Sequence, residues 1–182
     1  MPEKKYVENE KADMLMLELV SGFRELEEMD GAERLIPEVG LNMVVSKQDA
    51  KTPDDVLGLD GRVIVSRGKP RVCGEVAYGG STYLSSVLIN IAAKDQTKKA
   101  AVVVRGGRDI VEALSEMGKQ VLVLPPESTG KICPVDSYLE KGGEIFDVYN
   151  HPGAFGIEPT TTIVARSLRE ILDTLRELLK YV

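Results

Sequence analysis

Strand-like and helix-like segments alternate between residues 72 and 124, and this alternation constrains the fold more than any other feature. Residues 72–78, 100–104 and 121–124 are predicted to be strands, and the last two runs are continuously apolar, which is typical of buried strands. Between them, apolar side chains recur at spacings of three and four, the pattern of amphipathic helices. We therefore predict an α/β fold, a layered mixed sheet with helices packed on it, with parallel pairing in its middle.

The flanking segments extend this layered domain at both ends. Residues 11–29 and 168–180 carry apolar stripes and are predicted to be the first and last amphipathic helices. A short helix that begins after Thr52 and closes at Gly58 and Gly61 is predicted between the first two strands. The other predicted elements are strands at 41–45, 62–65, 145–149 and 160–164 and a short helix at 135–141.

Length and charge narrow the class of protein. The 182 residues contain no long linker, so we expect a single domain over 1–182, with residues 1–10 as a flexible tail. The chain lacks a long apolar run and begins with charged residues, so we expect no membrane span and no signal peptide, and a cytoplasmic location. The net charge of −6 and the scattered basic residues argue against nucleic acid as a direct partner.

Few residues suit a soft metal centre. Cys73 and Cys133 are far apart in the sequence, and His151 is the single histidine. A zinc site with two cysteine ligands is therefore not expected, and a metal centre with several histidines is excluded. Any metal is expected to be a hard cation held by carboxylates and phosphates.

Three glycine-containing loops follow predicted strands, where α/β sheets often bind ligands. The first contains Gly79, Gly80 and Ser81 and opens a helix. Backbone N–H groups at such a helix start favour an anion, which makes these residues candidates for phosphate binding. The alternative is a tight turn followed by an ordinary N-cap serine.

The second loop places two arginines around two glycines, as Arg105, Gly106, Gly107 and Arg108. Guanidinium groups form paired hydrogen bonds with phosphate or carboxylate, and glycines let a ligand approach the backbone. Arg105 follows a predicted buried strand directly, so it is the stronger candidate for ligand contact. Arg108 has the alternative of lying in solvent on the first turn of the next helix.

The third loop, residues 151–159, combines prolines that restrict the backbone with glycines, including Gly153, that relax it. Its His151 is a candidate hydrogen-bond donor to phosphate or a general acid or base, with a structural hydrogen bond as the alternative. Glu158 is a candidate for binding a heterocycle or a magnesium ion, or else an exposed loop charge. Asp136 is expected to cap the short helix after Pro134.

Several segments together resemble one family, the ThiN-type thiamine-phosphate synthase domain. They are residues 35–42 (LIPEVGLN), 52–56 (TPDDV) with 61–62 (GR), 78–81 (YGGS), and 150–159 (NHPGAFGIEP). The resemblance extends from about residue 11 to the end of the chain. The pairing of the PEVG segment with the GxxGxEP loop is its most specific part.

The resemblance implies a transferase that joins hydroxymethylpyrimidine diphosphate to hydroxyethylthiazole phosphate, giving thiamine phosphate and pyrophosphate. It implies phosphorylated small molecules as partners, and Mg²⁺ is inferred from the diphosphate substrate. The family is understood to use a histidine and an arginine. His151 is the candidate for the first, and Arg105, ahead of Arg108, for the second.

The same resemblance leaves a second function open. ThiN-like domains fused to DNA-binding domains sense thiamine phosphates, so a non-catalytic sensor working with a separate DNA-binding partner is the alternative. The apolar faces of the terminal helices also make a homodimer possible, although the core needs those faces equally.

Overall fold

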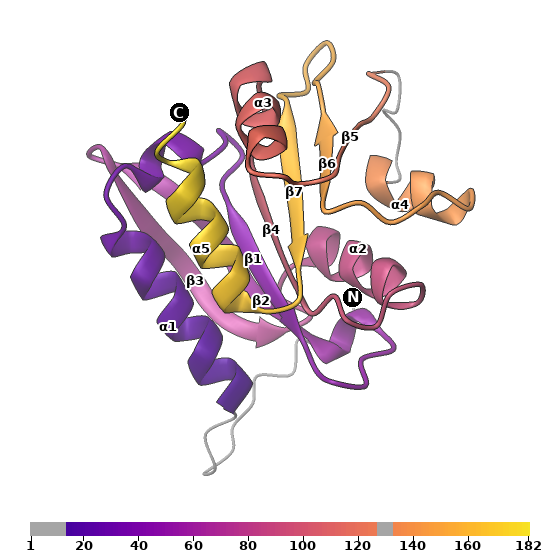
Figure 1. The fold of residues 1–182 in the computed structure, drawn as a ribbon. Coiled ribbons are helices and arrows are strands. Elements are labelled where there is room, and N and C mark those ends of the chain that lie inside the picture. The colour runs from indigo at the N-terminus through magenta and orange to yellow at the C-terminus, as the bar shows by residue number, and fades with distance from the viewer. Residues whose placement is uncertain (1–13, 127–132) are drawn as a thin grey trace.

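The chain forms one seven-stranded mixed sheet with helices on both faces, as a computed structural model shows (Figure 1). The structure describes residues 14–126 and 133–182. The strand order is β3-β2-β1-β4-β7-β6-β5. This confirms the predicted layered α/β sheet, whereas the predicted flexible tail at 1–10 lies outside the described residues.

The strands vary widely in length. β2 and β3 form a long hairpin at one edge of the sheet, and the shortest strand, β5, forms the other edge. Their bounds are β1 Asn42–Ser46, β2 Val56–Ser66, β3 Lys69–Tyr78, β4 Ala100–Arg105, β5 Val121–Val123, β6 Val148–His151 and β7 Thr160–Ala165.

Within the described residues, five α-helices cover the two faces of the sheet. α1, α3 and α5 pack on one face and α2 and α4 on the other, each side enclosing its own hydrophobic cluster. Their bounds are α1 Met14–Glu28, α2 Thr82–Ala92, α3 Arg108–Glu116, α4 Pro134–Glu140 and α5 Leu168–Leu178, with short 3-10 helices η1 Ala32–Leu35 and η2 Pro53–Asp55.

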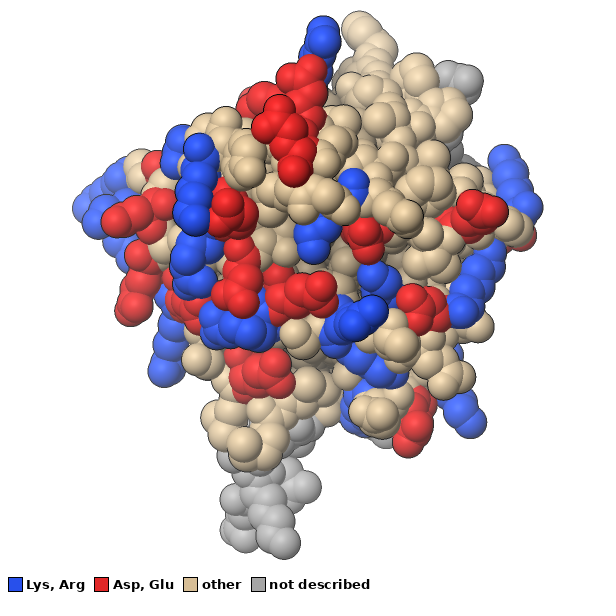
Figure 2. Space-filling model, in the orientation of Figure 1, with Lys and Arg blue, Asp and Glu red and all other residues tan. Residues whose placement is uncertain are grey.

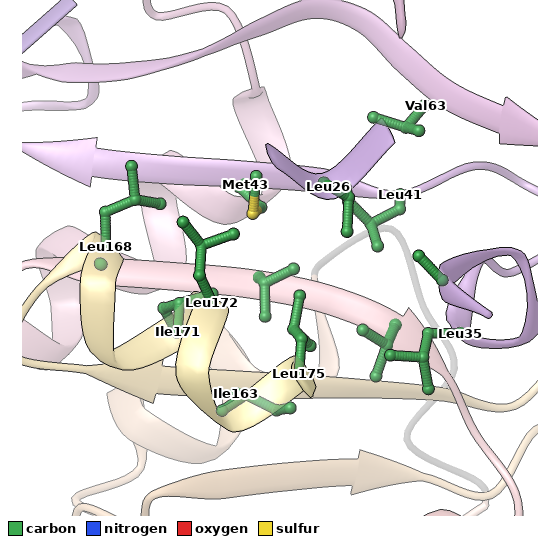
Figure 3. Close-up of a cluster of buried hydrophobic side chains, with 14 of the residues drawn as sticks. Leu26, Leu35, Leu41, Met43, Val63, Ile163, Leu168, Ile171, Leu172 and Leu175 are labelled. Carbon is green, nitrogen blue, oxygen red and sulfur yellow. The ribbon is translucent and has the colours of Figure 1, made fainter. Parts of the chain in front are cut away.

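The larger cluster lies under α1 and α5. Figure 3 shows Leu172 and Leu175 of α5 close to Met43 of β1 and Ile163 of β7. These side chains are at most 1% exposed, so the amphipathic stripes read from the sequence are buried here. The smaller cluster, under α2 and α4, leaves room at one end for a cavity.

The prediction of parallel pairing in the middle of the sheet is wrong. β4 pairs antiparallel with both β1 and β7, and β5–β6 is the parallel pair of this sheet. The chain crosses over through α2 and α3 as the alternation predicts, but β4 is not placed beside β3, nor β5 beside β4. β2 and β1 lie between β3 and β4, and β7 and β6 lie between β4 and β5, so the strands next to β4 are β1 and β7, both antiparallel to it.

Two predicted boundaries and one predicted burial also need correction. Gly58 and Gly61 do not close a helix, because η2 ends at Asp55 and both glycines lie inside β2. β6 begins three residues later than predicted, at Val148. β5 is an edge strand with Val123 53% exposed, so its apolar run does not reflect burial on both faces.

Gly61 is needed where it stands because the hairpin strands approach closely there. It faces Gly74 across the hairpin, and the two have φ values of +149° and +125°. A Cβ atom on Gly61 would lie 1.9 Å from the carbonyl oxygen of Cys73. The pair of glycines therefore belongs to the strand itself and not to a turn.

Charged side chains tie α1 to α5 on the solvent side. Glu25 accepts hydrogen bonds from Arg169 and Arg176, and Arg176 also pairs with Asp173. Figure 2 shows acidic and basic side chains interleaved over this face. The hydrogen bonds from Arg169 are the largest cause that lowers the pKa of Glu25, from 4.5 to about 2.

This network predicts an acid-dependent loss of stability. A carboxyl whose pKa falls on folding stabilises the fold fully above its unfolded value, and the gain is lost as the pH falls from 4.5 towards about 2. We expect Glu25→Gln to lower the free energy of unfolding by about 1 kcal/mol at pH 7 and by less at pH 3. Urea unfolding at both pH values measures the difference, and an equal deficit at pH 7 and pH 3 would contradict the assignment.

No helix among the described residues is long and apolar enough to cross a membrane.

Candidate active site

The site originates where β2 separates from β1. The two strands pair up to Val44 and Gly58, and meet again at the bridge between Leu41 and Val63, so that β2 has the longer path between these points. The side chain of Asn42 spans the opening. Its Nδ2 donates to the carbonyl of Leu59 at 2.9 Å, and its Oδ1 accepts from the Leu59 N–H at 3.0 Å. A buried amide thus replaces the missing ladder bonds and holds the strands apart.

A cavity of about 480 Å³ lies beside this opening, on the face of the sheet that carries α2 and α4. We call it the His151 cavity. Its volume suits a small organic ligand. Among the described residues that line it, Arg62 is the single arginine, and no lysine is present. The lining residues are Val39, Gly40, Asn42, Arg62, Ser81, Tyr83, Leu84, Val103, Pro134, His151, Gly156, Ile157, Glu158 and Thr160.

His151 ends β6 and forms part of the cavity wall. The residue is 6% exposed, and its Nδ1 accepts a hydrogen bond from the Gly153 N–H at 3.1 Å. Its Nε2 is buried and has no hydrogen-bond partner among the described residues. A buried polar atom without a partner is costly, so this nitrogen is suited to a bound ligand.

Glu158 connects two segments of the chain at the edge of the cavity. Its two carboxylate oxygens accept the backbone N–H groups of Glu38 and Val39, at 2.9 and 2.6 Å. These bonds join the PEVG segment to the GxxGxEP loop, the two segments that carry the family resemblance. The carboxylate therefore has a structural role between the loops, which accounts for the pairing of these motifs in the sequence.

Glu158→Gln is expected to loosen this connection without unfolding the protein. A glutamine side chain has one acceptor oxygen where the carboxylate has two, so one backbone N–H loses its partner. We expect faster amide exchange in residues 38–40 and 153–158, and a Michaelis constant raised roughly tenfold with a smaller change in kcat. Glu140→Gln, at an exposed position outside the cavity, is the control. Unchanged exchange in both loops would refute the clamp.

The first glycine-containing loop delivers one residue to the cavity. β3 runs antiparallel to β4 and β6, so its carboxyl end lies at the opposite end of the sheet from theirs. The chain turns back at Gly79 and Gly80, where a Cβ on Gly80 would lie 2.4 Å from the carbonyl oxygen of Gly58. Ser81, at the N-cap of α2, then lines the cavity, and its side chain makes no capping hydrogen bond.

The second loop lies outside the lining of the cavity. Arg105 is in the same row of the sheet as His151, with Thr160 between them. Its guanidinium pairs with both carboxylate oxygens of Asp109 and donates to the carbonyl of Arg34. These bonds connect β4, α3 and η1.

The neighbours of Arg105 also have structural partners. The Gly106 N–H donates to the carbonyl of Pro159 at 2.8 Å, and Gly107 precedes α3 with φ +130°. The Arg108 side chain is 91% exposed and pairs with Glu112. Asp136 accepts from Asn90 and does not cap α4 through its side chain, since Cys133 takes the N-cap position.

Sequence reasoning missed four polar residues of the wall, Asn42, Arg62, Tyr83 and Thr160. Asn42 and Arg62 project onto the cavity side of β1 and β2, and Tyr83 lies on the first turn of α2. Burial raises the pKa of the Tyr83 hydroxyl above its ordinary value, although 36% of the residue as a whole is exposed. The sequence signal for Arg62 was the GR pair at 61–62, which is one of the segments that resemble the family.

The family model for thiamine-phosphate synthase ThiN matches residues 18–177, which include every described residue of the cavity wall. The chain belongs to the ThiN family. A curated member, "Thiamine-phosphate synthase ThiN" of Methanothermobacter thermautotrophicus, is 26% identical over 92% of this chain and 95% of its own length.

Two solved structures share the ThiN fold seen here. The C-terminal domain of a phosphomethylpyrimidine kinase is 26% identical, with a TM-score of 0.77 over 91% of this chain and 98% of that chain. The C-terminal domain of protein MJ0236 is 21% identical, with a TM-score of 0.79 over 92% of this chain and 94% of that chain. These comparisons agree with the family resemblance, and they give no support to the alternative of a sensor.

Proposed function

We propose that this ThiN chain is a thiamine-phosphate synthase and that the His151 cavity is its active site. The reaction joins hydroxymethylpyrimidine diphosphate to hydroxyethylthiazole phosphate and releases pyrophosphate. The observation that carries the assignment to this cavity is the buried, unpartnered Nε2 of His151, which lies in a wall shared with Arg62 and the start of α2.

The charges of the cavity suit a diphosphate. Arg62 brings a guanidinium to its wall, and Ser81 marks the N-terminus of the eleven-residue helix α2. A guanidinium and the free N–H groups of a helix start both stabilise the negative charge that grows on a departing pyrophosphate. Because the guanidinium of Arg105 is bound to Asp109, the geometry favours Arg62 over Arg105 as the arginine of the site.

The remaining wall suits an aromatic heterocycle. Leu84 and Val103 supply apolar surface, and Asn42, Tyr83 and Thr160 supply polar groups at fixed positions. A mostly apolar wall with a few oriented polar groups is the usual form of a small-molecule site. The protein's task in this reaction is chiefly to position two phosphorylated substrates and exclude water from them.

We propose that Mg²⁺ reaches the site with the diphosphate substrate. Within residues 14–126 and 133–182, no group of three or more His, Cys, Asp or Glu side chains is arranged to hold a metal ion. The carboxylate of Glu158 is engaged with backbone N–H groups. Mg²⁺ commonly keeps water and substrate phosphates as its ligands, so a protein cage is not required.

We also propose a reducing, cytoplasmic setting for the reaction. Both cysteines, Cys73 and Cys133, are free thiols. Disulfides are rare in the cytoplasm, and free cysteines fit that compartment.

A coupling assay tests the proposed activity. Purified protein is incubated with both substrates and Mg²⁺, and thiamine phosphate is detected as its fluorescent oxidation product. We expect product in proportion to protein, and a loss of at least about 100-fold in His151→Ala. A wild-type protein that forms no product but is stabilised against heat by thiamine phosphate would overturn the synthase in favour of a sensor.

A further inference from the structure

The short turn after β6 determines which nitrogen of His151 carries its proton. The backbone N–H of Gly153 points at Nδ1 from 3.1 Å. A backbone N–H is only ever a donor, so Nδ1 has to be the acceptor in this pair. A neutral imidazole with Nδ1 as acceptor carries its hydrogen on Nε2.

The turn that presents this N–H is tightly constrained. Gly153 has φ +84°, and a Cβ atom there would lie 2.9 Å from the carbonyl oxygen of Ile157. Ala154 and Ile157 exchange two backbone hydrogen bonds, at 3.0 and 2.9 Å, which close the loop beyond it. Glu158 then ties the loop to residues 38 and 39. The donor to Nδ1 is thus held from both sides, and the imidazole is held with it.

The other ring nitrogen of His151, Nε2, differs from Nδ1 in its surroundings. Nε2 is buried in the wall of the cavity, and no acceptor among the described residues reaches it. An N–H group in that place satisfies its bonding only when a ligand supplies an acceptor. The phosphate oxygens of a diphosphate are strong acceptors, and the cavity also contains Arg62 for the remaining charge.

We propose that Gly153 is a positioning residue that fixes His151 as the Nε2–H tautomer, so that the imidazole donates a hydrogen bond to an oxygen of the departing diphosphate and does not act as a base. This role rests on the proposed function. The bond between the pyrimidine methylene carbon and the diphosphate oxygen breaks, and its electron pair leaves with pyrophosphate. The lone pair of the thiazole nitrogen then forms the new carbon–nitrogen bond, and His151 neither gains nor loses a proton.

Because the chain has one histidine, a spectrum of its imidazole is unambiguous. Protein labelled with ¹⁵N-histidine gives a single set of imidazole signals, whose multiple-bond correlations show which nitrogen is protonated. At neutral pH we expect the proton on Nε2, and we expect that N–H signal to shift when inorganic pyrophosphate and Mg²⁺ are added. A proton on Nδ1, or on both nitrogens, would overturn the proposal, and so would an unmoved signal in saturating pyrophosphate.

Two substitutions separate the donor from the base. The amide nitrogen of glutamine reaches about as far as Nε2, whereas that of asparagine lies nearer the place of Nδ1. If His151 is a donor, the coupling rate of His151→Gln is expected to be roughly tenfold or more above the rates of His151→Asn and His151→Ala. Equal rates in the three variants would contradict the donor role.

The two readouts also separate this proposal from the proposed function. The tautomer is read from the spectrum without any turnover. A wild-type protein with the expected tautomer but no coupling would refute the synthase and leave the geometry of His151 standing. Active protein with the wrong tautomer would refute the donor role and leave the synthase standing.

Discussion

Replacing Arg62 with alanine is expected to lower kcat/KM for coupling by about 100-fold or more while leaving the melting temperature within about 2 °C of the wild type. Arg62 is exposed, and its Nη1 donates to the adjacent carbonyl of Gly61, so its removal leaves no buried group without a partner. It is also the single arginine in the described lining of the cavity. Losing it leaves the charge of the pyrophosphate poorly compensated in the transition state.

Two other arginines serve as controls for Arg62. Arg71 is an exposed residue of the same hairpin outside the cavity, and Arg71→Ala is expected to retain wild-type activity. Arg105→Ala is expected to lower the melting temperature, because it removes the bonds to Asp109 and to the carbonyl of Arg34. Steady-state kinetics and thermal unfolding of the three variants show which arginine acts in catalysis and which one stabilises the fold. A fully active, stable Arg62→Ala beside an inactive, stable Arg105→Ala would return the role to Arg105.

Replacing Asn42 with alanine is expected to destabilise the fold by about 3 kcal/mol. The side chain is 2% exposed and satisfies both backbone groups of Leu59, so its loss strands a buried N–H and a buried carbonyl. Each stranded group costs about 1–3 kcal/mol. We also expect the separation between β1 and β2 to collapse, so coupling activity falls at temperatures where the variant is still folded.

Asn150→Ala is the matched control for Asn42. Asn150 is a buried asparagine whose amide donates to the hydroxyl of Thr161 at 2.9 Å and to the carbonyl of Thr160 at 3.5 Å. The Thr161 hydroxyl can reorient and the bond to Thr160 is long, so we expect a smaller loss of stability, about 1 kcal/mol. Urea unfolding measures both variants. Equal destabilisation by the two substitutions would argue against a special role for Asn42 at the strand opening.

The elements that could be predicted are those whose pattern is local. The apolar run at 100–104 and the stripes of the first and last helices depend on nearby residues, and β4, α1 and α5 follow them closely. The direction of pairing depends on which strands come between β3 and β4, and no local pattern records that. Gly58 and Gly61 were predicted to end a helix. They are glycines because a Cβ atom there would clash with residues that are distant in the sequence.

The residues of the candidate site also separate into those that local sequence predicts and those that depend on the pairing of distant strands. His151, at the end of β6, and Glu158, in the loop that follows, were both predicted from the prolines and glycines between them, and both line the cavity. Arg62 was not among the candidates, because its direction depends on the register of β2 against β1. Arg105 was a candidate because it follows a predicted buried strand, but its guanidinium pairs with Asp109, the second residue of α3.

Hydrogen exchange measured with and without thiamine phosphate shows whether substrates bind in the His151 cavity. Ligand in this cavity predicts slower exchange in residues 39–42, 81–84 and 151–158, with the rest of the sheet unchanged. A second cavity, lined by Lys47, Lys99 and Arg166, lies elsewhere on the molecule and offers a positive surface to the same phosphate. Protection around those three residues, with none at 151–158, would place the binding site in the second cavity and not in the His151 cavity.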